Sequence, residues 1–128
     1  MKNADANNEI QLQDALDPVV TRHLNAFLNN DLEAVVADYT EESVLITRDA
    51  TYTGPGQIRD FFTNLMIHFP KNKSLFKMDR VARDSDLVYI VWHANTPTVK
   101  VPLGTDTFIM RNGKIHKQTF AGEFHFTT

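Results

Sequence analysis

The chain has 128 residues, enough for one domain that buries roughly two-thirds of the surface its unfolded chain exposes. Its net charge of −3 provides no positive field for nucleic acid or an anionic membrane, so we expect neither as a partner. The absence of cysteine excludes disulfides, thiolate nucleophiles and cysteine metal sites. No apolar run reaches the length of a membrane span and no signal peptide is evident, so a cytoplasmic location is expected.

The N-terminal part of the chain predicts a polar arm followed by two short helices. Residues 1–16 are rich in asparagine and aspartate, as in a flexible or helical arm, and 17–128 are expected to form a single domain. Asp17 and Pro18 form a typical helix start, and apolar residues at helical spacing follow as far as Leu28. A second helix is predicted from Asp31, with Tyr39 on its apolar stripe.

The remaining elements predict a sheet interrupted by one helix. Residues 43–47 and 50–53 have strand character, and a third helix is expected from Pro55 until Pro70 ends it. From residue 74 onward the pattern is that of successive strands joined by turns. Helices followed by strands indicate an α+β fold in which the helices pack on one face of an antiparallel or mixed sheet.

The stretch LVYIVWH, residues 87–93, is apolar on both of its predicted faces. Helices can cover only one face of the sheet, so the other face is expected to pack against something else. A homodimer through the sheet is the simplest solution. The alternative is that the N-terminal arm or a loop covers this face.

Three segments resemble those of the nuclear transport factor 2-like superfamily, which includes ketosteroid isomerase and the SnoaL-like polyketide cyclases. They are NNDLEAVVADYTEESVLIT, YTGPGQIRDFF and DTFIMRNGKI, and they occur in the expected order. The resemblance implies a cone-shaped α+β barrel, in which three helices and a curved sheet enclose one pocket, and usually a dimer. Function varies widely on this fold, from isomerases and cyclases to modules that only bind a small molecule.

The resemblance also assigns site residues, position by position. His23 stands where the isomerase has its oxyanion-hole tyrosine, and Asp106 stands where it keeps a protonated aspartic acid. Thr47 replaces the general-base aspartate, and a hydroxyl is too weak a base to remove a carbon-bound proton unaided. His23 and Asp106 are therefore the candidate catalytic residues. Glu123 is the nearest match to an acid that matters in the cyclases.

A small-molecule pocket is predicted around these two residues, with a lining that is mostly aromatic and aliphatic. Packing of the same side chains as ordinary core is the alternative, and His23 could equally be a core histidine satisfied by one hydrogen bond. The candidate ligand-binding residues are Tyr39, Thr47, Phe62, Met66, Ile90, Trp92, Phe108, Gln118 and Phe120.

The face that Asp106 takes depends on the turn at Asn112 and Gly113. A two-residue turn would place Asp106 opposite Thr119, and a three-residue loop would place it opposite Gln118, as the resemblance favours. In the strand at residues 43–49, Leu45 and Thr47 are expected to face the pocket.

Arg48 is expected to point away from the pocket, and Asp49 is expected at the mouth of the strand. The histidines lack the spacing of a metal site, so we expect no metal and no cofactor.

Overall fold

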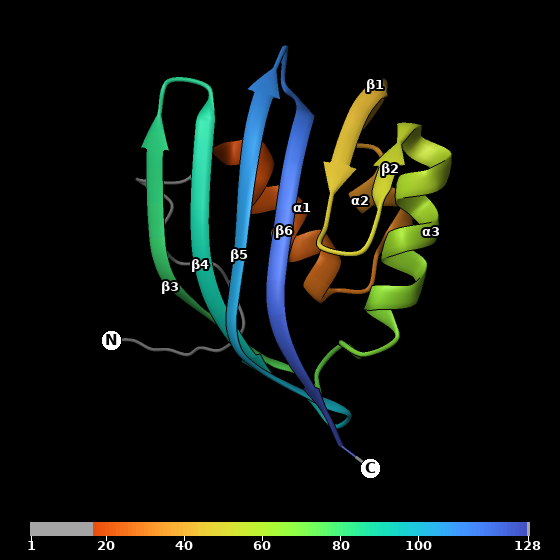
Figure 1. The fold of residues 1–128 in the computed structure, drawn as a ribbon, viewed down its shortest axis with the longest axis vertical. Helices are drawn as coiled ribbons and strands as arrows, with labels where there is room; N and C mark the ends of the chain where they lie inside the picture. Colours follow the sequence, from red (N-terminus) through yellow and green to blue (C-terminus); the bar gives the residue numbers. More distant parts are fainter. Residues whose placement is uncertain (1–16, 128) are drawn as a thin grey trace.

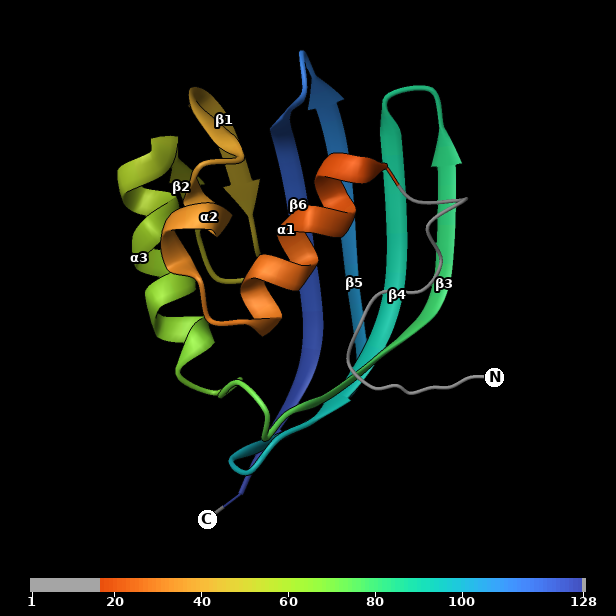
Figure 2. The ribbon, with the colours of Figure 1, turned by 180° about the vertical axis from the view of Figure 1, so that it is seen from behind.

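A computed structural model describes residues 17–127, and the predicted arm at 1–16 lies outside the described residues. Three helices pack on one face of a curved six-stranded sheet, as the sequence predicts (Figures 1 and 2). The helices are α1 (Pro18–Leu28), α2 (Leu32–Val36) and α3 (Gly54–Met66). The strands are β1 (Tyr39–Ile46), β2 (Thr51–Thr53), β3 (Leu75–Asp84), β4 (Leu87–Asn95), β5 (Val99–Arg111) and β6 (Lys114–Phe126).

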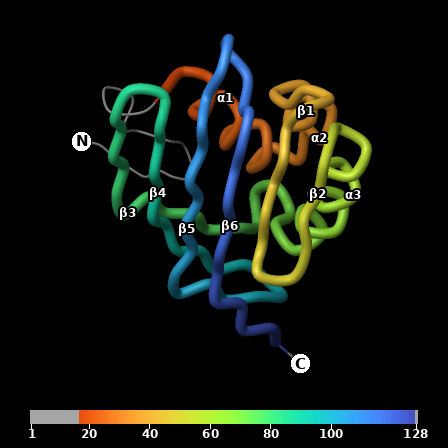
Figure 3. Tube along the Cα trace, turned by 45° about the horizontal axis from the view of Figure 1, so that its top comes forward, coloured from red at the N-terminus to blue at the C-terminus, as the bar shows by residue number. Residues whose placement is uncertain are grey.

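The sheet is mixed and open, with the order β2-β1-β6-β5-β4-β3. Strands β1 and β6 pair in parallel and the other neighbours pair antiparallel. Because β2 and β3 are both edge strands, the sheet does not close into the barrel that the resemblance implies. The tube in Figure 3 shows how the sheet wraps around the helices without closing.

The curvature of the sheet comes with bulges in β3 and β5, the two neighbours of β4. In β3 the extra residue lies between Met78 and Arg80, and in β5 residues 100–104 carry one extra residue against both β4 and β6. A bulge bends its strand and increases the local twist. The bulges on either side of β4 therefore bend the long strands, and the sheet has a concave face toward the helices (Figure 1).

The helix starts follow from local hydrogen bonds. Asp17 caps α1 by accepting from the Val19 amide at 2.7 Å, and Asp31 caps α2 by accepting from the Ala34 amide at 3.2 Å. The predicted second helix is too long, since α2 ends at Val36 and Tyr39 begins β1. The reason is tertiary, because the Ile115 amide of β6 donates to the Asp38 carbonyl at 2.8 Å and draws this segment into the sheet.

Both predicted registers for Asp106 are wrong. The turn has two residues, with Asn112 at φ 53° and Gly113 at φ 74°, as a tight hairpin requires. A bulge then shifts the pairing between Ile109 and Met110, and Asp106 pairs with Phe120. Asp106 and Phe108 lie on the concave face together with Gln118 and Phe120.

Candidate functional site: two cavities and a buried polar chain

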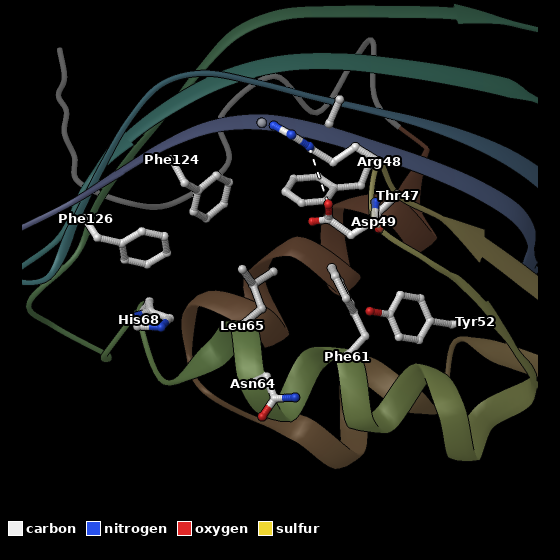
Figure 4. A pocket seen from close by; sticks show the side chains of 13 residues that line it. Thr47, Arg48, Asp49, Tyr52, Phe61, Asn64, Leu65, His68, Phe124 and Phe126 are labelled. Atoms are coloured by element: carbon white, nitrogen blue, oxygen red, sulfur yellow. Dashed lines mark hydrogen bonds and ion pairs between the residues drawn. The ribbon is translucent and has the colours of Figure 1, made fainter.

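An open pocket of about 570 Å³ lies between α3 and the second half of β6, under the loop that follows β1 (Figure 4). This volume is typical of sites for small organic ligands. Arg48 and Asp49 reach over the cavity from the β1 side, and Phe61 and Leu65 face them from α3 (Figure 4). The lining residues are Thr47, Arg48, Asp49, Tyr52, Phe61, Asn64, Leu65, His68, Phe120, Ala121, Gly122, Phe124 and Phe126.

A second, inner chamber of about 50 Å³ lies deeper in the domain. Phe61, Leu65 and Phe120 line both cavities, so these three side chains form an apolar partition between them. The inner volume suffices for about one or two water molecules. The remaining lining residues are His23, Leu24, Phe27, Phe62, Phe69, Phe76, Trp92, Asp106, Phe108 and Gln118.

The Asp106 carboxyl group is buried at the inner chamber and accepts two hydrogen bonds. The Trp92 indole nitrogen donates to Oδ2 at 2.9 Å, and the Gln118 amide nitrogen donates to Oδ1 at 2.9 Å. Burial raises the pKa of Asp106 to about 7, against the two hydrogen bonds, which lower it. Asp106 can therefore gain or lose a proton near neutral pH.

Trp92 is held in place by close packing on both faces. Its ring stacks on Phe120, with centroids 6.2 Å apart and planes 6° apart, and on Phe76 at 5.1 Å. Gly104 lies opposite Trp92 across β4 and β5. A Cβ atom on Gly104 would lie 2.4 Å from the indole ring, so this close approach requires glycine.

His23 is buried on α1 and uses both of its ring nitrogens. Nδ1 lies 3.0 Å from Oδ2 of Asp38, and Nε2 lies 3.2 Å from the Tyr39 hydroxyl. Arg22 hydrogen-bonds to the other carboxylate oxygen of Asp38. Burial raises the pKa of Asp38, but the hydrogen bonds from His23 and Arg22 outweigh burial and the net pKa is lowered. Asp38 is therefore ionised at neutral pH.

Tyr39 connects His23 to Asp106. Its hydroxyl donates to Oε1 of Gln118 at 2.5 Å, and Gln118 in turn donates to Asp106. Burial, together with the negative charges of Asp106 and Asp38, raises the pKa of Tyr39. The hydroxyl therefore stays protonated at neutral pH. We call the whole series the buried polar chain: Arg22, Asp38, His23, Tyr39, Gln118, Asp106 and Trp92.

Most of the predicted pocket residues lie around the inner chamber. His23, Asp106, Phe62, Trp92, Phe108, Gln118 and Phe120 line it. Tyr39 reaches the site through its hydrogen bonds instead. Ile90 is fully buried in the core and Met66 is half-buried against it, and neither lines one of the two cavities.

The prediction for the segment after β1 is only partly right. Thr47 lines the open pocket, but its hydroxyl is occupied by the loop, where it accepts from the amides of Asp49 and Ala50 at 3.2 Å. Leu45 lies fully buried in the core. Arg48 was predicted to point away, which is wrong. Strand alternation ends at Ile46, and Arg48 lines the pocket beside Asp49, with 3.5 Å between Nε and Oδ1.

Sequence reasoning missed Asp38 and Arg22. The apolar spacing after Asp31 predicts a helix through this segment, and that spacing gives no reason for Asp38 to point inward. The sequence offers one weak indication, the position of Asp38 next to Tyr39 at the end of a helix. An aspartate there turns inward only when a cation pairs with it. Glu123, in contrast, is exposed and pairs with His125 at 2.7 Å, outside both cavities.

Within residues 17–127, no cluster of three or more histidine, aspartate or glutamate side chains is arranged to hold a metal ion. None of the three helices in this range has the length and apolar character needed to cross a membrane.

A family model described as the SnoaL-like domain matches residues 20–118, which is more than half of the chain. A comparison with curated proteins found no match.

Solved structures with the same fold include a candidate polyketide cyclase from Sinorhizobium meliloti, with a TM-score of 0.71 and 16% identity over 87% of this chain and 99% of that chain. A candidate SnoaL-like polyketide cyclase from Shewanella denitrificans has a TM-score of 0.68 and 15% identity, covering 82% and 88% of the two chains. A nuclear transport factor 2-like protein from Cytophaga hutchinsonii has a TM-score of 0.68 at 8% identity, covering 82% and 87%. At these identities the similarity shows the fold alone.

Proposed function

Because the chain belongs to the SnoaL-like domain family, we propose that it binds a small, largely apolar organic molecule and acts on it by acid–base chemistry. The observation that carries this proposal is the Asp106 carboxyl group, which lines the inner chamber and has a pKa of about 7. A general acid or base works best when its pKa lies near the working pH. A buried carboxyl group with this pKa is therefore suited to exchange a proton with a ligand.

In this proposal Asp106 is the group that touches the ligand. In its neutral form it donates a hydrogen bond to a carbonyl oxygen, and in its ionised form it accepts a proton. His23 acts through Tyr39 and Gln118, because both of its ring nitrogens already have partners within the protein. Thr47 has no role as a base, since its hydroxyl serves the loop after β1.

The open pocket suggests the character of the ligand. Tyr52, Phe61, Phe120 and Phe124 present aromatic surface, which favours a flat ring system. Arg48 lies at the rim and suits an acidic group on the same molecule. The partition residues must move before such a molecule can reach Asp106, because the inner chamber alone is too small for it.

A screen of cyclic ketones and aromatic polyketide-like acids would test this function. Native protein and the Asp106→Asn variant are compared for binding, by calorimetry, and for turnover, by chromatography. We expect both proteins to bind the same compounds and only the native protein to convert one. Failure of every compound to bind the native protein would contradict the proposal.

A module that only binds its ligand is the second candidate. It is favoured by the pairing of the polar groups, since the hydrogen-bonding atoms of Asp106 and His23 already have partners in the buried polar chain. Equal binding with no turnover by either protein would support this alternative.

We also propose a homodimer through the sheet. The three helices of residues 17–127 leave one face of the sheet uncovered (Figures 1 and 2). Leu87, Tyr89 and Val91 alternate along β4 with buried residues that face the helices, so they lie on the uncovered face. Tyr89 and Val91 are only half-buried and Leu87 is exposed, so this face offers apolar surface to a second copy.

A further inference from the structure

The donor count along the buried polar chain restricts which protonation states are possible. Tyr39 has one hydroxyl proton, and its 2.5 Å bond to Oε1 of Gln118 commits that proton to Gln118. The Tyr39 oxygen can then only accept from Nε2 of His23, which must carry a proton. Nδ1 of His23 faces the ionised carboxylate of Asp38 and carries a proton as well. In this arrangement His23 is a cation.

The same arrangement favours the ionised form of Asp106. With the amide nitrogen of Gln118 donating to Oδ1 and the indole of Trp92 donating to Oδ2, the carboxylate accepts on both oxygens. The charges of the buried His23 and Asp106 then cancel, and buried Asp38 is paired with Arg22, whose side chain is largely exposed.

A second arrangement satisfies every group after the Gln118 amide turns over. Oε1 then accepts from a protonated Asp106, and the amide nitrogen donates to the Tyr39 oxygen. Tyr39 must now donate to Nε2 of His23, which is therefore neutral. One proton has left Nε2 of His23 and one has bound Oδ1 of Asp106. The two arrangements contain the same number of protons and the same net charge.

As long as the proton of Asp106 is directed at Gln118, any other combination breaks a hydrogen bond inside the protein. When His23 is cationic and a neutral Asp106 directs its proton at Gln118, two donors face each other at one link of the chain. When His23 is neutral and Asp106 is ionised, two acceptors face each other instead. A buried donor or acceptor without a partner is destabilising. We propose that His23 and Asp106 share one proton, and that the orientation of the Gln118 amide determines which of them carries it.

Both residues line the inner chamber, whose volume suffices for a water molecule that could carry the proton between them. The groups that face the pair are Asp38 with Arg22 behind it, the Tyr39 hydroxyl, the Trp92 indole, and the rings of Phe62 and Phe108. No other charged side chain in residues 17–127 is hydrogen-bonded to His23, Tyr39, Gln118 or Asp106.

This inference rests on the proposed function for its chemical meaning, because a ligand carbonyl that replaces Oε1 of Gln118 as the acceptor would stabilise neutral Asp106 and draw the proton away from His23. Gln118 is then a positioning residue that couples the two ends of the site. Its test needs neither ligand nor turnover, so failure of this inference and failure of the proposed function are distinguishable.

The first experiment uses the unmodified protein. NMR of the His23 ring nitrogens gives the cationic fraction of His23, and NMR of the Asp106 carboxyl carbon gives its protonated fraction. We expect the two fractions to sum to one across the neutral pH range. Independent titration, in which the sum falls steadily from two to zero without a plateau, would overturn the proposal.

The second experiment tests the route of coupling. Asp106→Asn mimics the protonated acid, because its amide can donate to Gln118, and we expect it to lower the cationic fraction of His23. Tyr39→Phe removes the hydroxyl that connects His23 to Gln118. In this background Asp106→Asn should change the cationic fraction of His23 at least fivefold less than it does in the native background.

The opposing result in the second experiment is an equal change in both backgrounds. It would show that the charge of Asp106 acts on His23 through space, and it would remove Gln118 from the mechanism. Tyr52→Phe, at the open pocket, is the matched control and should leave the coupling unchanged.

Discussion

The indole nitrogen of Trp92 donates to Asp106 at 2.9 Å, and the indole ring lies so close to Gly104 that no side chain fits between them. Gly104 on β5 leaves room for the ring of Trp92 on β4. Trp92 in turn holds Oδ2 of the buried Asp106 carboxyl group by its hydrogen bond.

Gly104→Ala should displace Trp92 and weaken its bond to Asp106. We expect the domain to lose about 1–3 kcal/mol of unfolding free energy, as overpacked cores do. The pKa of Asp106 should rise further, because the hydrogen bond from Trp92 now lowers it. Urea unfolding and the fluorescence of the single tryptophan measure both effects. Gly56→Ala is the control, since a Cβ atom there meets nothing within 4 Å; an equal shift in both variants would contradict the prediction.

The Asp106 carboxyl group should make the domain less stable as the pH rises. Its pKa is raised from 3.8 to about 7 in the folded state, so between these values the folded protein binds more protons than the unfolded protein. Its contribution to stability is complete below about pH 4 and is lost by about pH 7, a fall of at most about 4 kcal/mol.

Urea unfolding of native protein and Asp106→Asn at about pH 5 and about pH 8 checks this dependence. Between the lower and the higher pH, the unfolding free energy of the native protein should fall more than that of Asp106→Asn, because asparagine does not ionise. A difference that stays constant with pH would show that Asp106 ionises in the folded state as it does in the unfolded chain.

Asp38→Asn should be strongly destabilising at neutral pH. It removes the charge that pairs with Arg22 and His23 in a site where the carboxylate is only 1% exposed, and breaking a buried pair costs about 3–5 kcal/mol. Thermal and urea unfolding measure the loss. Glu33→Gln is the matched control, because its ion pair with Arg59 lies on the surface. A loss at Asp38 no larger than that at Glu33 would mean that the buried polar chain contributes little to stability.

Phe61→Ala should join the open pocket to the inner chamber. The phenyl ring is part of the partition, and Trp92 lies behind it at only 5% exposure. Quenching of tryptophan fluorescence by acrylamide should therefore increase severalfold. Phe126 lines the open pocket but not the inner chamber, so Phe126→Ala should leave the quenching unchanged. Unchanged quenching in a folded Phe61→Ala variant would refute the partition.

The dimer proposal is tested by sedimentation. The native chain should sediment as a dimer at micromolar concentration, and Val91→Glu should give a monomer because it buries a charge in the apolar interface. Ile67→Glu, on an exposed α3 position, should remain dimeric. A native monomer whose association increases after removal of residues 1–16 would favour the arm as the cover of this face.

Local patterns in the sequence predict most of the fold, because apolar spacing and caps act over a few residues. Asp17 and Pro18 begin α1 as predicted, and period-two alternation places Asp106 beside Phe108 on the concave face. The register and the site partners could not be predicted in the same way. Asp106 meets Phe120 because of one bulge, and Asp38 turns inward because Arg22 and His23 meet it from another element.

The buried polar chain also has a consequence for the order of events in folding. Tyr39 and Gln118 are 79 positions apart, and His23 and Asp38 come from elements that must already be packed together. Contacts between distant segments require most of the chain to be ordered beforehand, so these hydrogen bonds should be absent from the folding transition state. Their strength would then govern how slowly the native domain unfolds, while the rate at which it folds depends on the hairpins of β3 to β6.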